Sequence, residues 1–213
     1  TYAGVNNGTT VQFVQPGACA SLGVASPADY CQENPFLGVA CYVNGTGDPS
    51  YTGYLTFDYN SSNTEVLDPY IPIANSTEIG TVWGSAYQKN KQRIFSSTFL
   101  KRYSGMKDGP GYVYYFDINS SNGTLTSTIN SFNLQGLTPA NAGSMLGGTG
   151  AIDVGTICRD AGCGNAQDNV LPSDPTVQSI DLDAFGKVGD ISFGDIDMEN
   201  DNTLWLTNLN ANQ

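Results

Sequence analysis

The stretches Val82–Leu100, VWGSAYQKNKQRIFSSTFL, and Ser192–Leu209, SFGDIDMENDNTLWLTNL, decide the fold, because the second repeats the pattern of the first 110 residues later. Each copy has the pattern of a strand, a polar turn and a second strand. A gap-free alignment matches Trp83 with Phe193, Gly84 with Gly194, Ile94 with Leu204, and Phe95 with Trp205. Self-similarity at a fixed distance predicts a repeat architecture, and we expect the matched aromatic residues to pack in its core.

The residues around the first copy predict a four-stranded antiparallel sheet. Its expected strands are Ile79–Gln88, Arg93–Leu100, Gly111–Ile118 and Thr124–Leu134. The last two are joined by Asn119–Gly123, NSSNG, which ends in the Asn-Gly pair typical of hairpin turns. Four such strands in about 55 residues are typical of one β-propeller blade or one sheet of a sandwich.

We therefore expect an all-β fold in which antiparallel sheets are arranged as β-propeller blades, forming a partial propeller with long irregular loops. The expected parts are a loop-rich N-terminal segment with three cysteines (1–52), a partial blade plus one four-stranded blade (53–134), a long insertion loop (135–190) and the first half of a further blade (191–213). Because the last part would end in mid-blade, we expect the chain to be a fragment of a longer protein with open strand edges.

The composition limits the classes of partner. Eight basic residues against twenty acidic ones give a formal net charge of −12. Nucleic acid and anionic membrane surfaces are therefore unfavourable partners, since both require a basic patch. No apolar run has the length of a membrane span, so membrane insertion is not expected either.

The five cysteines and the absence of histidine bear on chemistry and location. The lack of a CxxC pair and of any histidine argues against zinc fingers, haem attachment and thioredoxin chemistry. Cysteines in loop sequence fit an oxidising compartment, which predicts a secreted, extracellular or cell-surface protein. Cys158 and Cys163 can close one short loop, and two of the first three can close another, for which Cys31 and Cys41 are the candidates. One thiol is left over.

Two carboxylate patterns are candidate sites. Asp195, Asp197 and Asp201 belong to an alternating acidic run, and carboxylates on one face of a strand suit calcium. The alternative for this run is a solvated β-turn. Asp181 and Asp183 form a second pair, which we expect to lie in an exposed acidic loop.

Other side chains indicate surface contacts rather than catalysis. Tyr112 and Tyr114 alternate with Val113 and Tyr115, so we expect Tyr112 and Tyr114 to face outward as contact residues. Triads that use histidine are impossible in this chain, and we expect no enzyme activity. Six Asn-x-Ser/Thr sequons, at Asn7, Asn44, Asn60, Asn75, Asn119 and Asn122, leave glycosylation open, because the composition alone explains most of them.

Three segments carry a resemblance to a known family. They are Val82–Ile118, which extends the first repeat copy, Ala28–Gly45, ADYCQENPFLGVACYVNG, and Phe185–Leu209, FGKVGDISFGDIDMENDNTLWLTNL. These segments resemble the propeller-type N-terminal region of large bacterial secreted surface proteins that carry serine–aspartate-repeat B-like and collagen-adhesin B-like repeats. The resemblance implies a propeller at a bacterial surface and brings no catalytic signature.

These observations favour a non-catalytic extracellular recognition or adhesion module of a bacterial cell-surface protein. Its expected partners are the remainder of its own polypeptide or another surface protein, contacted through open β edges, and glycans. One alternative is a structural subunit of an extracellular filament or surface layer, which the odd cysteine and the open edges would serve. The other is a secreted propeller hydrolase or lyase with metal-bound carboxylates, in which calcium would be the cofactor.

Overall fold

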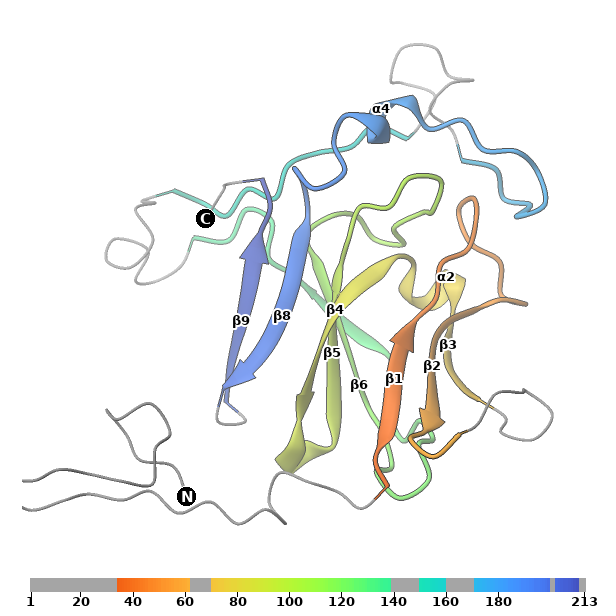
Figure 1. Cartoon of the computed structure of the whole chain (residues 1–213). Coiled ribbons are helices and arrows are strands. Elements are labelled where there is room, and N and C mark those ends of the chain that lie inside the picture. Colours follow the sequence, from red (N-terminus) through yellow and green to blue (C-terminus); the bar gives the residue numbers. More distant parts are fainter. Residues whose placement is uncertain (1–33, 62–69, 139–149, 160–170, 200–201, 211–213) are drawn as a thin grey trace, which may run out of the picture. The chain divides into compact units, whose positions relative to one another are not determined.

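The computed structural model describes residues 34–61, 70–138, 150–159, 171–199 and 202–210. The chain divides into two compact units, residues 1–35 and 36–213. Of the first unit only Asn34 and Pro35 are described, so the architecture below is that of the second unit. It consists of antiparallel sheets with short helical turns (Figure 1), as the all-β prediction stated. The described residues do not form a closed barrel or propeller.

Three sheets follow one another along the chain, with strand orders β1-β2-β3, β4-β5-β6-β7 and β8-β9. The strands are β1 (Phe36–Ala40), β2 (Thr52–Asp58), β3 (Ile71–Asn75), β4 (Val82–Gln88), β5 (Arg93–Thr98), β6 (Tyr112–Asp117), β7 (Asn130–Asn133), β8 (Phe193–Glu199) and β9 (Thr203–Asn208). The helical turns are α2 (Ser76–Ile79), η2 (Lys89–Lys91) and α4 (Leu182–Phe185). Every pairing within the sheets is antiparallel.

The predicted four-stranded sheet is present, with shorter first and last strands. β4 begins at Val82 because the preceding residues form α2, which starts with a capping box. In this box the Asn75 side chain accepts the amide of Glu78, and the Glu78 carboxylate accepts the amide of Asn75. β7 begins at Asn130, because the turn after β6 extends through a bridge between Ile118 and Leu125.

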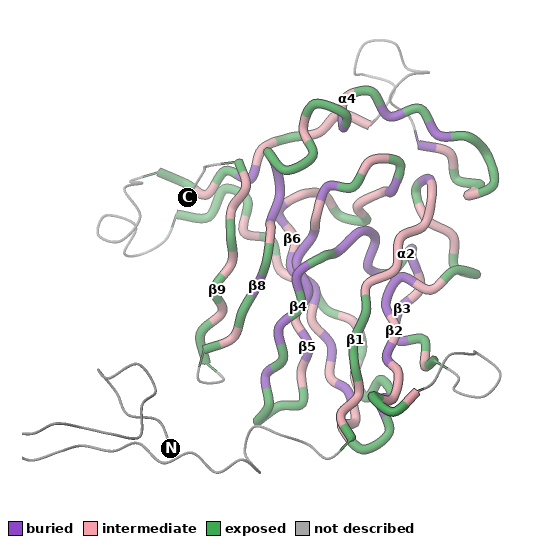
Figure 2. The backbone as a smooth tube through the Cα atoms, viewed as in Figure 1, coloured by how far each residue is buried: buried purple, intermediate pink, exposed green. Residues whose placement is uncertain are grey.

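Both faces of this four-stranded sheet are covered, as the buried strands at its centre show in Figure 2. One face packs on the first sheet through Tyr54, Ile73, Ala74, Ile79, Val82, Ile94, Tyr114, Phe116 and Ile118. The other face packs on β8 and β9 through Ala86, Val113, Val154, Phe193 and Ile196. Burial on both faces explains why β6, YVYYFD, is almost continuously apolar and aromatic.

The repeat is real, but its gap-free alignment is wrong for the first strands. Gln88 pairs with Arg93, whereas Glu199 pairs with Thr203, so the second turn is one residue shorter. The equivalent of Phe193 is therefore Val82 and not Trp83. Both hairpins also carry a register shift at the same place, after Val82 and after Phe193.

The predicted core packing of the tryptophans is wrong for the same reason. A slip of one residue moves a side chain to the opposite face of a strand. Val82 and Phe193 are both buried, whereas Trp83 is 58% exposed. Trp205 does match Phe95, but it is 55% exposed, because no described segment covers its face of β9.

The predicted extent of the N-terminal loop-rich segment needs one correction, and the long connection agrees with the prediction where it is described. The first sheet begins at Phe36, inside the segment 1–52 that was expected to be loop-rich, because β1 pairs along its whole length with β2. The connection from 135 to 190 is irregular where it is described, apart from α4. It is anchored by a small apolar cluster of Leu100, Ala184 and Ile191. Among the described helices, none is long and apolar enough to cross a membrane.

Candidate functional site

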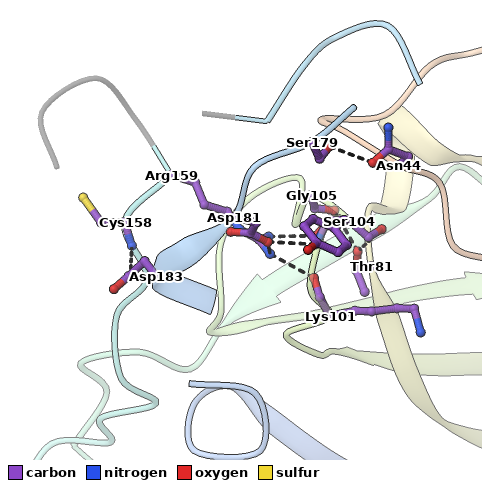
Figure 3. Close-up of polar contacts among 11 residues, drawn as sticks. Asn44, Thr81, Lys101, Ser104, Gly105, Cys158, Arg159, Ser179, Asp181 and Asp183 are labelled. Atoms are coloured by element: carbon purple, nitrogen blue, oxygen red, sulfur yellow. Dashed lines mark hydrogen bonds and ion pairs between the residues drawn. The ribbon is translucent and has the colours of Figure 1, made fainter. Parts of the chain in front are cut away.

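A buried ion pair within the long connection lies against the loop between β5 and β6 (Figure 3). Arg159 donates from Nη2 to Oδ2 of Asp181 at 2.6 Å and from Nε to Oδ1 at 3.1 Å. The side chain of Asp181 is 0% exposed and that of Arg159 is 11% exposed. Such a two-point geometry is the strong form of a charge-assisted hydrogen bond.

Backbone groups of the neighbouring loop form further hydrogen bonds with both side chains of the pair. Arg159 also donates to the carbonyl oxygens of Ser104 (2.7 Å) and Lys101 (2.9 Å). Asp181 accepts the amide of Tyr103 at 2.8 Å. Each charge is thus compensated, which makes this network a structural clamp. The expectation that Asp181 lies in an exposed acidic loop is wrong, because a carboxylate buried this deeply requires a paired cation.

Asp183, the other member of the predicted carboxylate pair, lies apart from the clamp. It accepts the backbone amide of Cys158 at 2.8 Å and the Lys187 ammonium at 2.9 Å. Partial burial favours the neutral acid, but these two donors and the nearby charge of Arg159 together outweigh it and lower the pKa of the Asp183 carboxyl. Both aspartates therefore hold the segment Cys158–Arg159, Asp181 through the Arg159 side chain and Asp183 through the Cys158 amide, and each is paired with a cation.

Asn44 fixes another part of the connection. Its amide nitrogen donates to the carbonyl oxygens of Pro175 (2.9 Å) and Val177 (2.7 Å), and its amide oxygen accepts the hydroxyl of Ser179 (2.7 Å). Figure 3 shows Ser179 beside Asn44, close to the Arg159 network. A shallow hollow of about 410 Å³ lies beside this contact, lined by Asn44, Tyr103 and the residues Pro175, Thr176, Val177, Gln178 and Ser179.

The outward face of the β8–β9 hairpin carries a different set of side chains, which we call the outer face: Asp195, Asp197, Glu199, Thr203 and Trp205. These residues alternate with Ile196, Met198, Leu204 and Leu206, which pack toward the four-stranded sheet. The indole nitrogen of Trp205 donates to Oε2 of Glu199 at 3.0 Å. Trp205 corresponds to Phe95, whose face of the sheet is covered by β8 and β9.

The predicted calcium ligands lie partly on this outer face. Asp195 and Asp197 each accept a neighbouring backbone amide, from Ile196 and Met198. Asp201 lies outside the described residues. In the described part of the chain, no group of three or more acidic, cysteine or histidine side chains is arranged to hold a metal ion, so a calcium site stays a prediction.

The predicted surface contact at Tyr114 is wrong. Tyr114 is 1% exposed and belongs to the cluster between the first and second sheets, because both faces of this sheet are covered. Its hydroxyl donates to Asp108 at 3.0 Å. Burial, followed by the nearby Asp108 charge, raises the pKa of Tyr114 well above its ordinary value. Tyr112 is half-buried and stacks on Tyr114 with ring centroids 6.5 Å apart.

The cysteines differ from the predicted pairing at one position. Cys41 is a free thiol, so its predicted disulfide is wrong. The other described cysteine, Cys158, is already disulfide-bonded, so it cannot form a disulfide with Cys41. Cys31 and Cys163 lie outside the described residues, so the pairing of Cys158 with Cys163 stays a prediction.

Sequence reasoning missed Arg159 and Asn44, the two residues that hold the connection in place. One signal was present for Arg159: it is one of only eight basic residues, and the connection after it carries six scattered aspartates, at 160, 168, 174, 181, 183 and 190. A scarce cation in an acidic segment is a candidate for a buried pair. Asn44 was noted only as a sequon, which carries no information about tertiary contacts.

The comparisons with known proteins give three relatives from Dictyostelium discoideum, each over 128 residues. Colossin-A is 30% identical over 56% of this chain, Colossin-D is 27% identical over 51%, and Colossin-B is 25% identical over 57%. The chain spans 1%, 14% and 3% of the lengths of these three relatives, respectively. No family model and no solved structure matches the chain.

These relatives overturn the resemblance to bacterial surface proteins with serine–aspartate-repeat B-like and collagen-adhesin B-like repeats. They are proteins of a eukaryote, so the bacterial source expected for this chain is wrong as well. What the comparisons support is a similarity to colossins over about half of the chain.

Proposed function

We propose that the chain is a non-catalytic extracellular recognition and adhesion module whose contact surface is the outer face of the β8–β9 hairpin. One observation carries the proposal: Trp205 is 55% exposed at the position where the other hairpin of the repeat has Phe95, a residue covered by a neighbouring sheet. No described segment therefore covers this face of β9, whereas the corresponding face of β5 packs against a neighbouring sheet. Uncovered aromatic residues beside polar groups are characteristic of interfaces.

The chemistry of the outer face favours a protein partner with basic side chains. Asp195, Asp197 and Glu199 are exposed on one face of β8, and Trp205 stands across from Asp197 on β9. Carboxylates attract lysine and arginine, and the face of an indole ring binds the same cations. The net charge of −12 adds long-range attraction for a basic surface.

The proposal also includes the arrangement of the three sheets. We propose that the three sheets are successive blades of a propeller, of which the four-stranded sheet is complete. The support is that consecutive antiparallel sheets pack face to face, with β4 in contact with β8. On this view the partner that binds the outer face supplies a further sheet with basic side chains, either as another protein or as a further part of the same polypeptide. Fast amide exchange along β8 and β9 in native material would contradict this propeller.

Binding measurements on matched tryptophan variants test the proposed function. Trp205→Ala removes the centre of the outer face, whereas Trp83→Ala removes an equally exposed tryptophan elsewhere. Binding of the chain to extracellular-matrix and cell-surface proteins is measured by surface plasmon resonance at low and high salt. We expect a salt-sensitive interaction that Trp205→Ala abolishes and Trp83→Ala leaves intact. Equal loss in both variants, or no binding at all, contradicts the proposal.

The filament or surface-layer subunit remains a second candidate because a second face is open. Leu37 and Val39 of β1 are exposed, and they lie across from Phe57 and Leu55 of β2. An exposed apolar edge strand favours association between copies. Sedimentation velocity over a wide concentration range decides this point, since a subunit of an assembly forms ordered oligomers and a recognition module stays monomeric.

A further inference from the structure

The six sequons differ in what their asparagine side chains do in the folded chain. We infer that the folded, secreted protein carries an N-linked glycan on Asn122 and none on Asn44. This inference rests on the proposed extracellular location, because attachment of such glycans occurs in the secretory pathway. It concerns residues remote from the outer face of the β8–β9 hairpin.

Asn122 presents its amide nitrogen to solvent. It is exposed in the turn between β6 and β7, and its nitrogen makes no hydrogen bond to any residue that the structure describes. Its amide oxygen accepts from Thr124, from the backbone amide at 3.2 Å and from the hydroxyl at 2.8 Å. The side chain is therefore held by its oxygen alone, and the nitrogen that would carry the sugar stays open.

The backbone next to Asn122 is held against the first sheet. Gly123 is buried with a φ of 69°, and its carbonyl oxygen accepts the hydroxyl of Thr56 at 2.7 Å. A Cβ at Gly123 would meet the ring of Phe36, so this side of the turn lies against the first sheet. The backbone is anchored on that side, while the side chain of Asn122 is exposed and, among the described residues, forms hydrogen bonds with Thr124 alone.

Asn44 has the opposite arrangement. Both hydrogens of its amide nitrogen are directed at backbone carbonyls, those of Pro175 and Val177, 131 and 133 residues away in sequence. Its oxygen is engaged by Ser179. A sugar on this nitrogen would replace one hydrogen and occupy the space of the segment Pro175–Ser179.

The chemistry of transfer makes this difference decisive. An oligosaccharide moves from a polyprenyl-diphosphate donor, so that a bond forms between its anomeric carbon and the asparagine nitrogen. The bond from that carbon to the diphosphate breaks, and the nitrogen loses one proton. Because transfer acts on the chain before it folds, a chain modified at Asn44 cannot form the contacts with Pro175 and Val177. It is therefore lost from the folded population, whereas a chain modified at Asn122 folds normally.

The test is to express the full chain with an added leader peptide in a eukaryotic secretory host. The secreted, monodisperse fraction is treated with peptide N-glycosidase in heavy-oxygen water, and the labelled aspartates are located by peptide mass spectrometry. Thr124→Ala and Thr46→Ala are matched variants, since each removes one sequon but keeps its asparagine. Asn44→Gln removes the same sequon as Thr46→Ala, and in addition it disturbs the contacts of Asn44.

We expect label at Asn122, none at Asn44, loss of one glycan in Thr124→Ala and an unchanged glycan mass in Thr46→Ala. Asn44→Gln should lower the secreted yield, which Thr46→Ala should not. Label at Asn44 in folded protein, or an unlabelled Asn122, overturns the inference. Because the leader is supplied, such a failure would not bear on the native location or on binding by Trp205.

Discussion

Arg159 and Asp181 form a two-point ion pair with a shortest contact of 2.6 Å, in which the carboxylate has no exposure to solvent. The two residues are 22 positions apart in the sequence, in a connection with little regular structure. Their hydrogen bonds hold this connection against the loop that contains Tyr103 and Ser104. In an acidic protein with eight basic residues, one cation is thus committed to the interior. The stability of the folded chain should therefore depend strongly on this pair.

Breaking the pair from either side should destabilise the chain strongly. Asp181→Ala leaves a nearly buried guanidinium without its counter-charge, for which we expect a loss of about 3–5 kcal/mol in the free energy of unfolding. Arg159→Ala leaves a fully buried carboxylate and should cost a similar amount. Urea unfolding followed by circular dichroism measures both.

The double variant is the control for the ion pair. Arg159→Ala with Asp181→Ala removes both charges, so its loss should be smaller than the sum of the single losses. Asp174→Ala removes an exposed aspartate that bonds only within its own turn, and it should lose much less stability. Additive single losses would mean that the two charges do not interact.

The face-to-face packing of the sheets depends on Gly84. A Cβ at this position would lie 2.8 Å from the backbone nitrogen of Ile196 and 3.0 Å from the carbonyl oxygen of Gly194. Because these are backbone atoms of β8, Gly84→Ala must push the hairpin away from the sheet, at a cost of about 1–3 kcal/mol. Thermal unfolding of the variant measures the loss.

Gly194 provides the matched control for Gly84. A Cβ there would lie 3.2 Å from the end of the Leu209 side chain and 3.4 Å from Cβ of Thr207, within its own hairpin. These side chains can adjust, so Gly194→Ala should lose less stability than Gly84→Ala. The opposite order would indicate that β4 and β8 do not pack as closely as described.

Two buried tyrosines should make the protein sensitive to alkali. Burial raises the pKa of Tyr54 and of Tyr114 above the ordinary value of 10.0. Below that value both states are protonated and stability is unaffected; above it the unfolded chain releases protons that the folded chain retains. The free energy of unfolding should therefore fall with rising pH above about 10, by about 1.4 kcal/mol per unit for each tyrosine. Urea titrations across this range, with Tyr114→Phe and Tyr54→Phe as variants of reduced slope, test the expectation. A slope that neither variant changes would assign the effect to other groups.

The strands were predictable from the sequence wherever a strong turn separated two apolar runs. The Asn-Gly pair in Asn119–Gly123 and the polar turn after Gln88 gave β4, β5 and β6 to within about three residues. The repeat also predicted β8 and β9. The correspondence between the first strands of the two hairpins was not predictable. A gap-free alignment matches Trp83 with Phe193, but the second turn is one residue shorter, so Val82 is the structural equivalent of Phe193.

The site was harder to predict because it consists of long-range contacts. Asn44 bonds to residues more than 130 positions away, and nothing local in the sequence marks such a pairing. Tyr114 looked like an outward residue because alternation is typical of half-buried sheets, but a second layer covers the other face as well. Patterns along one strand reveal its two faces and do not reveal how many layers cover them.

Cys41 should react slowly with alkylating reagents in the folded protein. It is a half-buried free thiol directly after β1, and burial raises its pKa, so less of the reactive thiolate is present near neutral pH. Iodoacetamide labelling under non-reducing conditions, followed by peptide mapping, should show slower modification of Cys41 than of a cysteine in a short peptide. In urea the rate should rise to that of the peptide, because unfolding removes the burial. Cys41→Ser identifies the modified peptide unambiguously. A Cys41 that resists labelling in urea and appears in a disulfide-linked peptide with Cys31 would contradict the free thiol and restore the pairing that the sequence suggested.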